Sequence, residues 1–140
     1  MKILLAVDGS TYTKRMLAYI ATHEELIGAS NEITVITAVT PVPPHVTGFI
    51  DKATLQQYYA DEAEAVLKPV RAFAEQKQWK PTFTSAVGNA ADVIAKAANE
   101  GKVDLVVMGS HGHSALGSLV MGSVTSRVMA HCTAPVLIVR

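Results

Sequence analysis

The chain has 140 residues, close to the usual size of one domain, so we expect a single domain over residues 1–140. Hydrophobic residues make up 49% of the chain and charged residues 17%, a composition too apolar for intrinsic disorder. The 12 basic and 12 acidic side chains cancel, so the chain has no overall field that would attract nucleic acid or an anionic membrane. Any bound anion therefore has to be held by local groups. Cys132 is the only cysteine, which excludes an intrachain disulfide.

The sequence contains no segment with the pattern of a signal peptide or a membrane-spanning helix. Its first apolar run, residues 3–7, ends at Asp8 after only five residues. A membrane-spanning helix needs about 20 apolar residues in succession. Together with the lone thiol, this pattern predicts a cytoplasmic protein that does not insert into membranes.

The first half of the chain alternates strand and helix patterns. In chain order these predict a strand at 3–7, a helix ending at 26, a strand at 33–39, a helix at 51–77 and a strand at 82–87. Ser10 or Thr11 is placed to cap the first helix and Gly28 to stop it. The proline-rich residues 40–45 cannot continue the second strand, and Pro69 predicts a kink or a break near residues 65–69.

The second half repeats the same alternation. Its patterns predict a helix at 89–101, a strand at 103–108, a loop at 109–121, a helix at 123–130 and a strand at 135–139. Asn89 and Asp92 resemble a capping pair at the start of the first of these helices. With right-handed crossovers, this order gives a doubly wound, mostly parallel five-stranded α/β sheet with helices on both faces. Ligands of such sheets bind beyond the carboxyl ends of the strands, which here brings Asp8, Val39, Gly88 and the loop from Gly109 to one edge.

That loop has the composition of an anion-binding segment. Its spacing is Gly109, two residues, Gly112, nine residues, and then Gly122-Ser123. It joins a buried strand to a helix start, so its glycines would let the backbone amides and the helix dipole approach an anion. Ser123 and Thr125 add hydroxyl groups, whereas residues 103–124 contain neither lysine nor arginine. The spacing matches neither the Walker nor the dinucleotide pattern, so the residues alone leave phosphate binding and simple turns equally open.

From end to end the sequence resembles the universal stress protein family. Three segments carry the resemblance: Ala6-Val7-Asp8-Gly9-Ser10, Val106-Val107-Met108-Gly109-Ser110-His111-Gly112, and Gly122-Ser123-Val124 with Ala134-Pro135-Val136-Leu137-Ile138-Val139. The glycine spacing is the signature of the ATP-binding branch of that family, and a second branch lacks these glycines. The resemblance implies an adenine nucleotide alpha hydrolase-like fold with strand order 3-2-1-4-5.

The resemblance also implies the site. It assigns Gly109, Gly112, Gly122, Ser123 and Val124 to the phosphates and ribose of ATP or another adenine nucleotide, Ala6, Val7, Val39 and Met108 to adenine, and Thr125 to a further contact. Asp8 would face the ribose or a Mg²⁺ ion carried by the phosphates.

The resemblance further implies a homodimer joined along Pro135–Val139. The sequence supports this independently, because an aliphatic strand at a sheet edge invites aggregation unless it is paired or covered. Shielding by Arg140 and a nearby helix is the alternative.

Three functions remain possible. The first is a cytoplasmic ATP-binding module that acts as a dimer in stress adaptation, with an unknown downstream partner. The second is a slow ATP hydrolase, although the loop lacks a cation for the developing charge. The third is a dimerisation scaffold without nucleotide.

Several other residues have alternative interpretations. His111 and His113 are closely spaced, but without further ligands they are better placed to approach a phosphate than to bind a metal. We expect Cys132 to be buried beside the last strand. The segment 41–49 is either a lid over the nucleotide or a passive connection.

Overall fold

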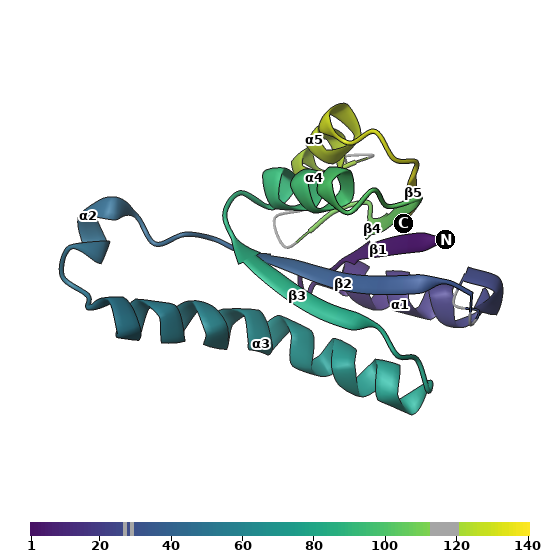
Figure 1. Cartoon of the computed structure of the whole chain (residues 1–140), viewed down its shortest axis with the longest axis horizontal. Helices are drawn as coiled ribbons and strands as arrows, with labels where there is room; N and C mark the ends of the chain where they lie inside the picture. The colour runs from purple at the N-terminus through teal and green to yellow at the C-terminus, as the bar shows by residue number, and fades with distance from the viewer. Residues whose placement is uncertain (27, 29, 113–120) are drawn as a thin grey trace.

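The computed structural model describes residues 1–26, 28, 30–112 and 121–140 (Figure 1). Its elements in chain order are β1 (Lys2–Ala6), α1 (Thr11–Ala21), η1 (Glu24–Leu26), β2 (Glu32–Val39), α2 (Pro44–Thr47), α3 (Lys52–Gln76), β3 (Thr82–Val87), α4 (Ala90–Glu100), β4 (Leu105–Gly109), α5 (Ser123–His131) and β5 (Val136–Val139).

The strands form one five-stranded sheet with the order β3-β2-β1-β4-β5, and every neighbouring pair is parallel. Helices α1 and α3 cover one face of the sheet, and α4 and α5 cover the other (Figure 1). This confirms the doubly wound α/β fold and the strand order 3-2-1-4-5. The winding reverses between β1 and β4, so a ligand crevice belongs at the carboxyl ends of these two strands.

The core consists of two layers, one on each face of the sheet. Alternate residues of β1 enter different layers: Ile3 and Leu5 face α1 and α3, whereas Leu4 and Ala6 face α4 and α5. Each of these four side chains is at most 8% exposed. A strand buried on both faces therefore reads as an uninterrupted aliphatic run, which is the pattern that the sequence shows.

Two helices depart from the sequence prediction. Helix α1 ends at Ala21 rather than at residue 26. The Thr22 hydroxyl donates to the carbonyl of Tyr19, and the His23 Nδ1 lies 2.7 Å from the same oxygen. These side chains take the place of the backbone N–H that would bond to this carbonyl if the helix continued. Helix α3 runs through Pro69 from Lys52 to Gln76, so it does not break there, and the alternative of a kink near residues 65–69 stays a prediction.

Residues 40–62 form a projecting arm. It contains the proline-rich connection, α2 and the first turns of α3, and it extends beyond the carboxyl ends of β2 and β3 (Figure 1). None of its residues is buried, and Phe49 is 91% exposed. Within the arm the Tyr59 hydroxyl accepts the backbone N–H of Val42 at 2.8 Å. Burial along α3 begins at Ala63, where the helix reaches the sheet.

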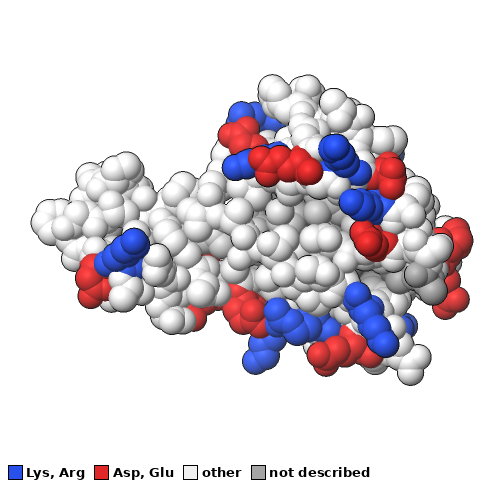
Figure 2. All heavy atoms as spheres, viewed as in Figure 1, with Lys and Arg blue, Asp and Glu red and all other residues white. Residues whose placement is uncertain are grey.

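Charged side chains are scattered over several elements on the face seen in Figure 2, and the tip of the projecting arm is largely free of them. The sequence agrees, because residues 33–50 contain no lysine, arginine, aspartate or glutamate. In the described part of the chain, no helix is long and apolar enough to cross a bilayer.

Candidate functional site

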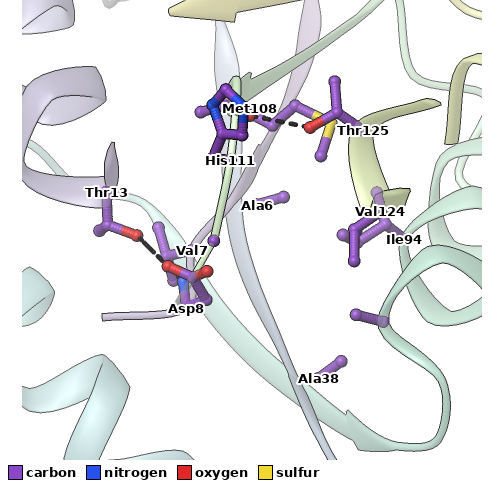
Figure 3. Close-up of a pocket in the computed structure, with 13 residues that line it drawn as sticks. Ala6, Val7, Asp8, Thr13, Ala38, Ile94, Met108, His111, Val124 and Thr125 are labelled. Atoms are coloured by element: carbon purple, nitrogen blue, oxygen red, sulfur yellow. Dashed lines mark hydrogen bonds between the residues drawn. The ribbon is translucent and has the colours of Figure 1, made fainter. Parts of the chain in front are cut away.

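A hollow of about 90 Å³ opens at the carboxyl ends of β1 and β4 (Figure 3). We call it the edge hollow, and the residues that line it are Ala6, Val7, Asp8, Thr13, Ala38, Ala90, Ile94, Met108, Gly109, His111, Gly112, Val124 and Thr125. They come from β1, β2, β4, the loops after β1 and β4, and the starts of α1, α4 and α5. Its position is the crevice that this topology provides for ligands.

Asp8 is held in place by the first turn of α1. Its Oδ1 accepts the backbone N–H of Ser10 at 2.9 Å and the hydroxyl of Thr13 at 2.9 Å (Figure 3). The Asp8 N–H donates in turn to the Thr13 oxygen at 3.0 Å. Gly9, between them, has a φ of 77°, a conformation that favours glycine in this tight turn. The sequence Asp-Gly-Ser therefore fixes one carboxylate oxygen and orients the group toward the edge hollow.

The three glycines of the loop motif occupy places where a side chain would collide with this chain's own atoms. A Cβ on Gly109 would lie 2.6 Å from the Cβ of Tyr12, and one on Gly112 would lie 2.6 Å from the Asp8 Oδ2. A Cβ on Gly122 would lie 3.3 Å from the Cα of His111. The glycines thus allow close contacts with Asp8 after β1, with Tyr12 of α1 and with His111, a role that the spacing alone does not reveal.

The start of α5 is tied to the end of β4. The N–H of Gly122 donates to the Ser110 carbonyl at 2.7 Å, and the buried Thr125 hydroxyl donates to the Gly109 carbonyl at 3.0 Å. Ser123 is the first residue of α5 and is exposed. The amino end of α5 is thereby fixed beside the edge hollow, where its dipole and first N–H groups favour an anion.

Two polar atoms near the edge hollow are buried without a hydrogen-bond partner: the Ser10 Oγ and the His111 Nε2. Ser10 occupies the N-cap position predicted for α1, but its hydroxyl makes no capping bond. The other ring nitrogen of His111 lies 3.0 Å from the Ser110 Oγ. Buried polar atoms are nearly always hydrogen-bonded in native structures, so these two are what a site for a polar ligand would present.

The structure brings most of the predicted site residues together. Those that line the edge hollow are Ala6, Val7, Asp8, Met108, Gly109, Gly112, Val124 and Thr125. Gly122 and Ser123 lie at the adjoining start of α5 but outside its lining. Val39 is buried and does not line it either, whereas its neighbour Ala38 does.

Sequence reasoning missed four lining residues: Thr13, Ala38, Ala90 and Ile94. Ala38 was missed because successive residues of a strand point to opposite faces, and the sequence does not show which face of β2 carries the hollow. Ala90 and Ile94 are brought there by α4, whose N-cap Asn89 accepts N–H bonds from Ala91 and Asp92. The predicted cap was thus a usable signal for the position of α4.

The described residues contain no group of three or more His, Cys, Asp or Glu side chains that could hold a metal ion. His113 lies outside the described residues, so its pairing with His111 stays a prediction. The segment 41–49 lies in the projecting arm and does not line the edge hollow. Cys132, predicted to be buried beside the last strand, is only partly buried and packs against the α4/α5 layer.

A model of the universal stress protein family matches residues 1–140. The chain belongs to this family. It is 34% identical over 139 residues to the universal stress protein in the QAH/OAS sulfhydrylase 3′ region of Thermus aquaticus, covering 99% of this chain and 97% of that protein.

Two solved structures illustrate the fold of this universal stress protein. The hypothetical protein MJ0577 of Methanocaldococcus jannaschii superimposes with a TM-score of 0.81 and 27% identity, over 99% of this chain and 94% of that one. A universal stress protein from Archaeoglobus fulgidus in complex with dAMP superimposes with a TM-score of 0.69 and 20% identity, over 100% and 98% of the two chains.

Proposed function

We propose that this universal stress protein binds an adenine nucleotide, ATP in particular, in the edge hollow and acts as a dimeric regulatory module in stress adaptation in the cytoplasm. The observation that carries the proposal is the meeting of Asp8, the glycine loop and the start of α5 at the carboxyl ends of β1 and β4. The glycine spacing belongs to the ATP-binding branch of the family. The complex of the Archaeoglobus fulgidus relative with dAMP supports a nucleotide at this kind of fold.

The edge hollow suits the base of a nucleotide. Small or apolar side chains, such as Ala6, Ala38 and Met108, line its interior. A hollow of about 90 Å³ suits one flat ring system better than a whole nucleotide, so the ribose and phosphates would lie along its mouth.

The polar groups at the mouth suit the remainder of the ligand. The carboxylate of Asp8 can accept ribose hydroxyl groups or contribute an oxygen ligand to a Mg²⁺ ion carried by the phosphates. Backbone N–H groups at the start of α5 would meet the phosphates. The residues at or beside this helix start are Gly112, Gly122, Ser123 and Thr125.

The proposal includes a dimer formed through β5. This strand is an edge of the sheet, and its four residues are all aliphatic. Pro135 and Val139 direct their carbonyl groups to β4, so those of Val136 and Ile138 point away from the sheet. Pairing with the same strand of a second copy would satisfy these groups and cover the partly exposed side chains. Light scattering that shows only the monomer mass at a protein concentration of about 100 μM would contradict the dimer.

Binding without rapid hydrolysis is the expected behaviour. No lysine or arginine lines the edge hollow, and transfer of a phosphoryl group normally requires a cation near the developing charge. We therefore expect phosphate to be released at a rate well below about one turnover per second, which is the lower end of the usual range for enzymes.

The test is a substitution that fills the edge hollow with a larger side chain. Ala38→Leu places a larger side chain among the lining residues, whereas Ala60→Leu makes the same change on the exposed surface of the projecting arm. Adenine nucleotide released from the denatured wild-type protein, or a calorimetric titration with ATP, should show binding. Ala38→Leu should abolish it and Ala60→Leu should leave it unchanged. Absence of nucleotide from the wild type, together with no response to added ATP, would favour the scaffold function instead.

A further inference from the structure

The charges of the edge hollow do not match those of a nucleoside polyphosphate. Its lining includes the carboxylate of Asp8 and no lysine or arginine. A triphosphate brings several further negative charges, and backbone amides with one helix dipole compensate them only in part. Besides a Mg²⁺ ion carried by the phosphates, a protein cation beside the hollow would favour long phosphate chains over a monophosphate.

Arg15 is connected to His111, in the loop after β4, through Tyr12, by a cation–π contact and a pair of rings tilted by 45°. Its guanidinium carbon lies 5.0 Å from the centre of the Tyr12 ring, and that ring lies 5.1 Å from the ring of His111. Tyr12 in turn fills the space above Gly109, where a Cβ would approach it to 2.6 Å. We call this series the Arg15–Tyr12–His111 stack.

Helix geometry directs this stack toward the site. Residues 12 and 15 lie on the same face of α1, and side chains on a helix lean toward its amino end. The amino end of α1 follows directly on the turn of Asp8, beside the edge hollow. Arg15 consequently lies over the turn nearest the loop, and the last member of the stack, His111, carries the buried Nε2 that has no partner.

Three other cations of the described residues lie near this end of the sheet, and one of them, Arg140, is exposed and follows Val139, the partner of Gly109. Lys14 lines a groove between α1 and α3 on a different side of the helix. Arg127 pairs with Asp92 at 3.4 Å. Neither ion pair of the described residues involves Arg15, and its side chain is exposed.

We propose that Arg15 binds the distal phosphates of the nucleotide and makes the site prefer nucleoside triphosphates and diphosphates over monophosphates. This inference rests on the proposed nucleotide function. The guanidinium group suits the role, because it forms paired hydrogen bonds with phosphate oxygens and is only weakly hydrated. Stacking on Tyr12 restricts the side chain before the ligand arrives, which lowers the entropic cost of binding.

The experiment compares the affinities for ATP and AMP by calorimetry in the wild type, Arg15→Gln and Lys14→Gln. Arg15→Gln should weaken ATP binding by about tenfold, the effect of losing one charge-assisted contact, while AMP binding changes by less than about twofold. Lys14→Gln removes the same charge one residue away and should leave the ratio of the two affinities unchanged. Arg15→Lys keeps the positive charge but lacks the planar guanidinium that forms paired hydrogen bonds, so it should keep part of the preference for ATP over AMP.

A titration with inorganic tripolyphosphate separates this inference from the proposed function. If ATP binds but Arg15→Gln changes ATP and AMP affinities equally, or changes neither, the role of Arg15 is wrong while the nucleotide site stands. If no nucleotide binds but tripolyphosphate binds in an Arg15-dependent manner, the nucleotide function is wrong and the phosphate role stands. If none of these ligands binds to the wild type, both are wrong.

Discussion

The loops at the carboxyl ends of β1 and β4 and the projecting arm leave the same edge of the sheet, yet they are built in opposite ways. At this edge, a Cβ on Gly109 or Gly112 would meet Tyr12 or Asp8 at 2.6 Å, and one on Gly122 would meet His111 at a tight 3.3 Å. In the projecting arm no residue is buried, and Gly48 has no neighbouring atom within 4 Å of the place where its Cβ would be. Because close packing positions chemical groups, we expect the site to lie beside these three glycines and the arm to contribute little to stability or ligand binding.

The sharpest contrast is between the interior of the sheet and the tip of the arm. Leu5 is 2% exposed, and Leu5→Ala should lower the free energy of unfolding by about 2–5 kcal/mol, because it leaves a cavity in the α1/α3 layer. Phe49→Ser, at a side chain that is 91% exposed, should change it by less than about 0.5 kcal/mol. Urea denaturation of both variants measures the difference. A large loss for Phe49→Ser would mean that the arm is held by contacts with the body of the protein.

A second pair of variants compares glycines of the two regions. Gly112→Ala drives a methyl group against the Asp8 carboxylate, which two hydrogen bonds prevent from moving aside. It should cost about 1–3 kcal/mol in the free energy of unfolding and remove nucleotide binding. Gly48→Ala should be neutral or stabilising by up to about 1 kcal/mol, because it only restricts the unfolded chain. Thermal unfolding and ATP titration of each variant provide the measurements, and full ATP affinity in Gly112→Ala would contradict the close packing described for the loop.

A third prediction concerns the cap of α4, which brings Ala90 and Ile94 to the edge hollow. Asn89→Ala removes bonds of 3.0 and 3.3 Å to the N–H groups of Ala91 and Asp92. It should lower the free energy of unfolding by about 1 kcal/mol and weaken nucleotide binding modestly. Asn89→Asp retains an acceptor oxygen and should preserve both properties. Equal losses in the two variants would show that the cap does not position the start of α4.

The smallest expected effect is a pH dependence confined to the arm. Hydrogen bonds from the backbone and side chain of Thr54 lower the pKa of Asp51, the N-cap of α3, below its ordinary value of 3.8. Because the folded state binds this proton less readily, the cap stabilises α3 fully above about pH 3.8 and loses its effect as the pH falls through the lowered pKa. The protection of the Thr54 amide against exchange, taken relative to the intrinsic rate at each pH, should therefore fall below that pH, while global stability depends on the other groups. An Asp51 carboxyl that titrates at or above its ordinary value by NMR would contradict this.

The sequence predicted the fold well because the central strands are buried on both faces. A short aliphatic run such as Ile3–Val7 is typical of a strand buried on both faces. The glycine, proline and asparagine residues between such runs mark the turns. Right-handed crossovers then predict a doubly wound parallel sheet, whereas the strand order 3-2-1-4-5 came from the family resemblance. Strand ends predicted the positions of Asp8 and Gly109 beside the edge hollow, whereas Met108 was assigned through the family resemblance.

What the sequence did not predict depends on contacts between distant segments. The choice between Val39 and Ala38 requires knowing which face of β2 borders the hollow. The exposure of the first turns of α3 requires knowing where the sheet ends, because the apolar pattern of a helix is the same whether or not a partner lies against it. The contact of Tyr12 with Gly109 joins α1 to β4, and no local pattern encodes it.

The most direct test of the account is a titration of ¹⁵N-labelled protein with ATP, followed by the backbone amide signals. The account predicts that the shifted signals lie at Val7, Ala38, Gly112 and Val124 around the edge hollow, while those of residues 44–62 in the projecting arm stay in place. Shifts concentrated in the arm, or no shifts at an ATP concentration of about 1 mM, would contradict it.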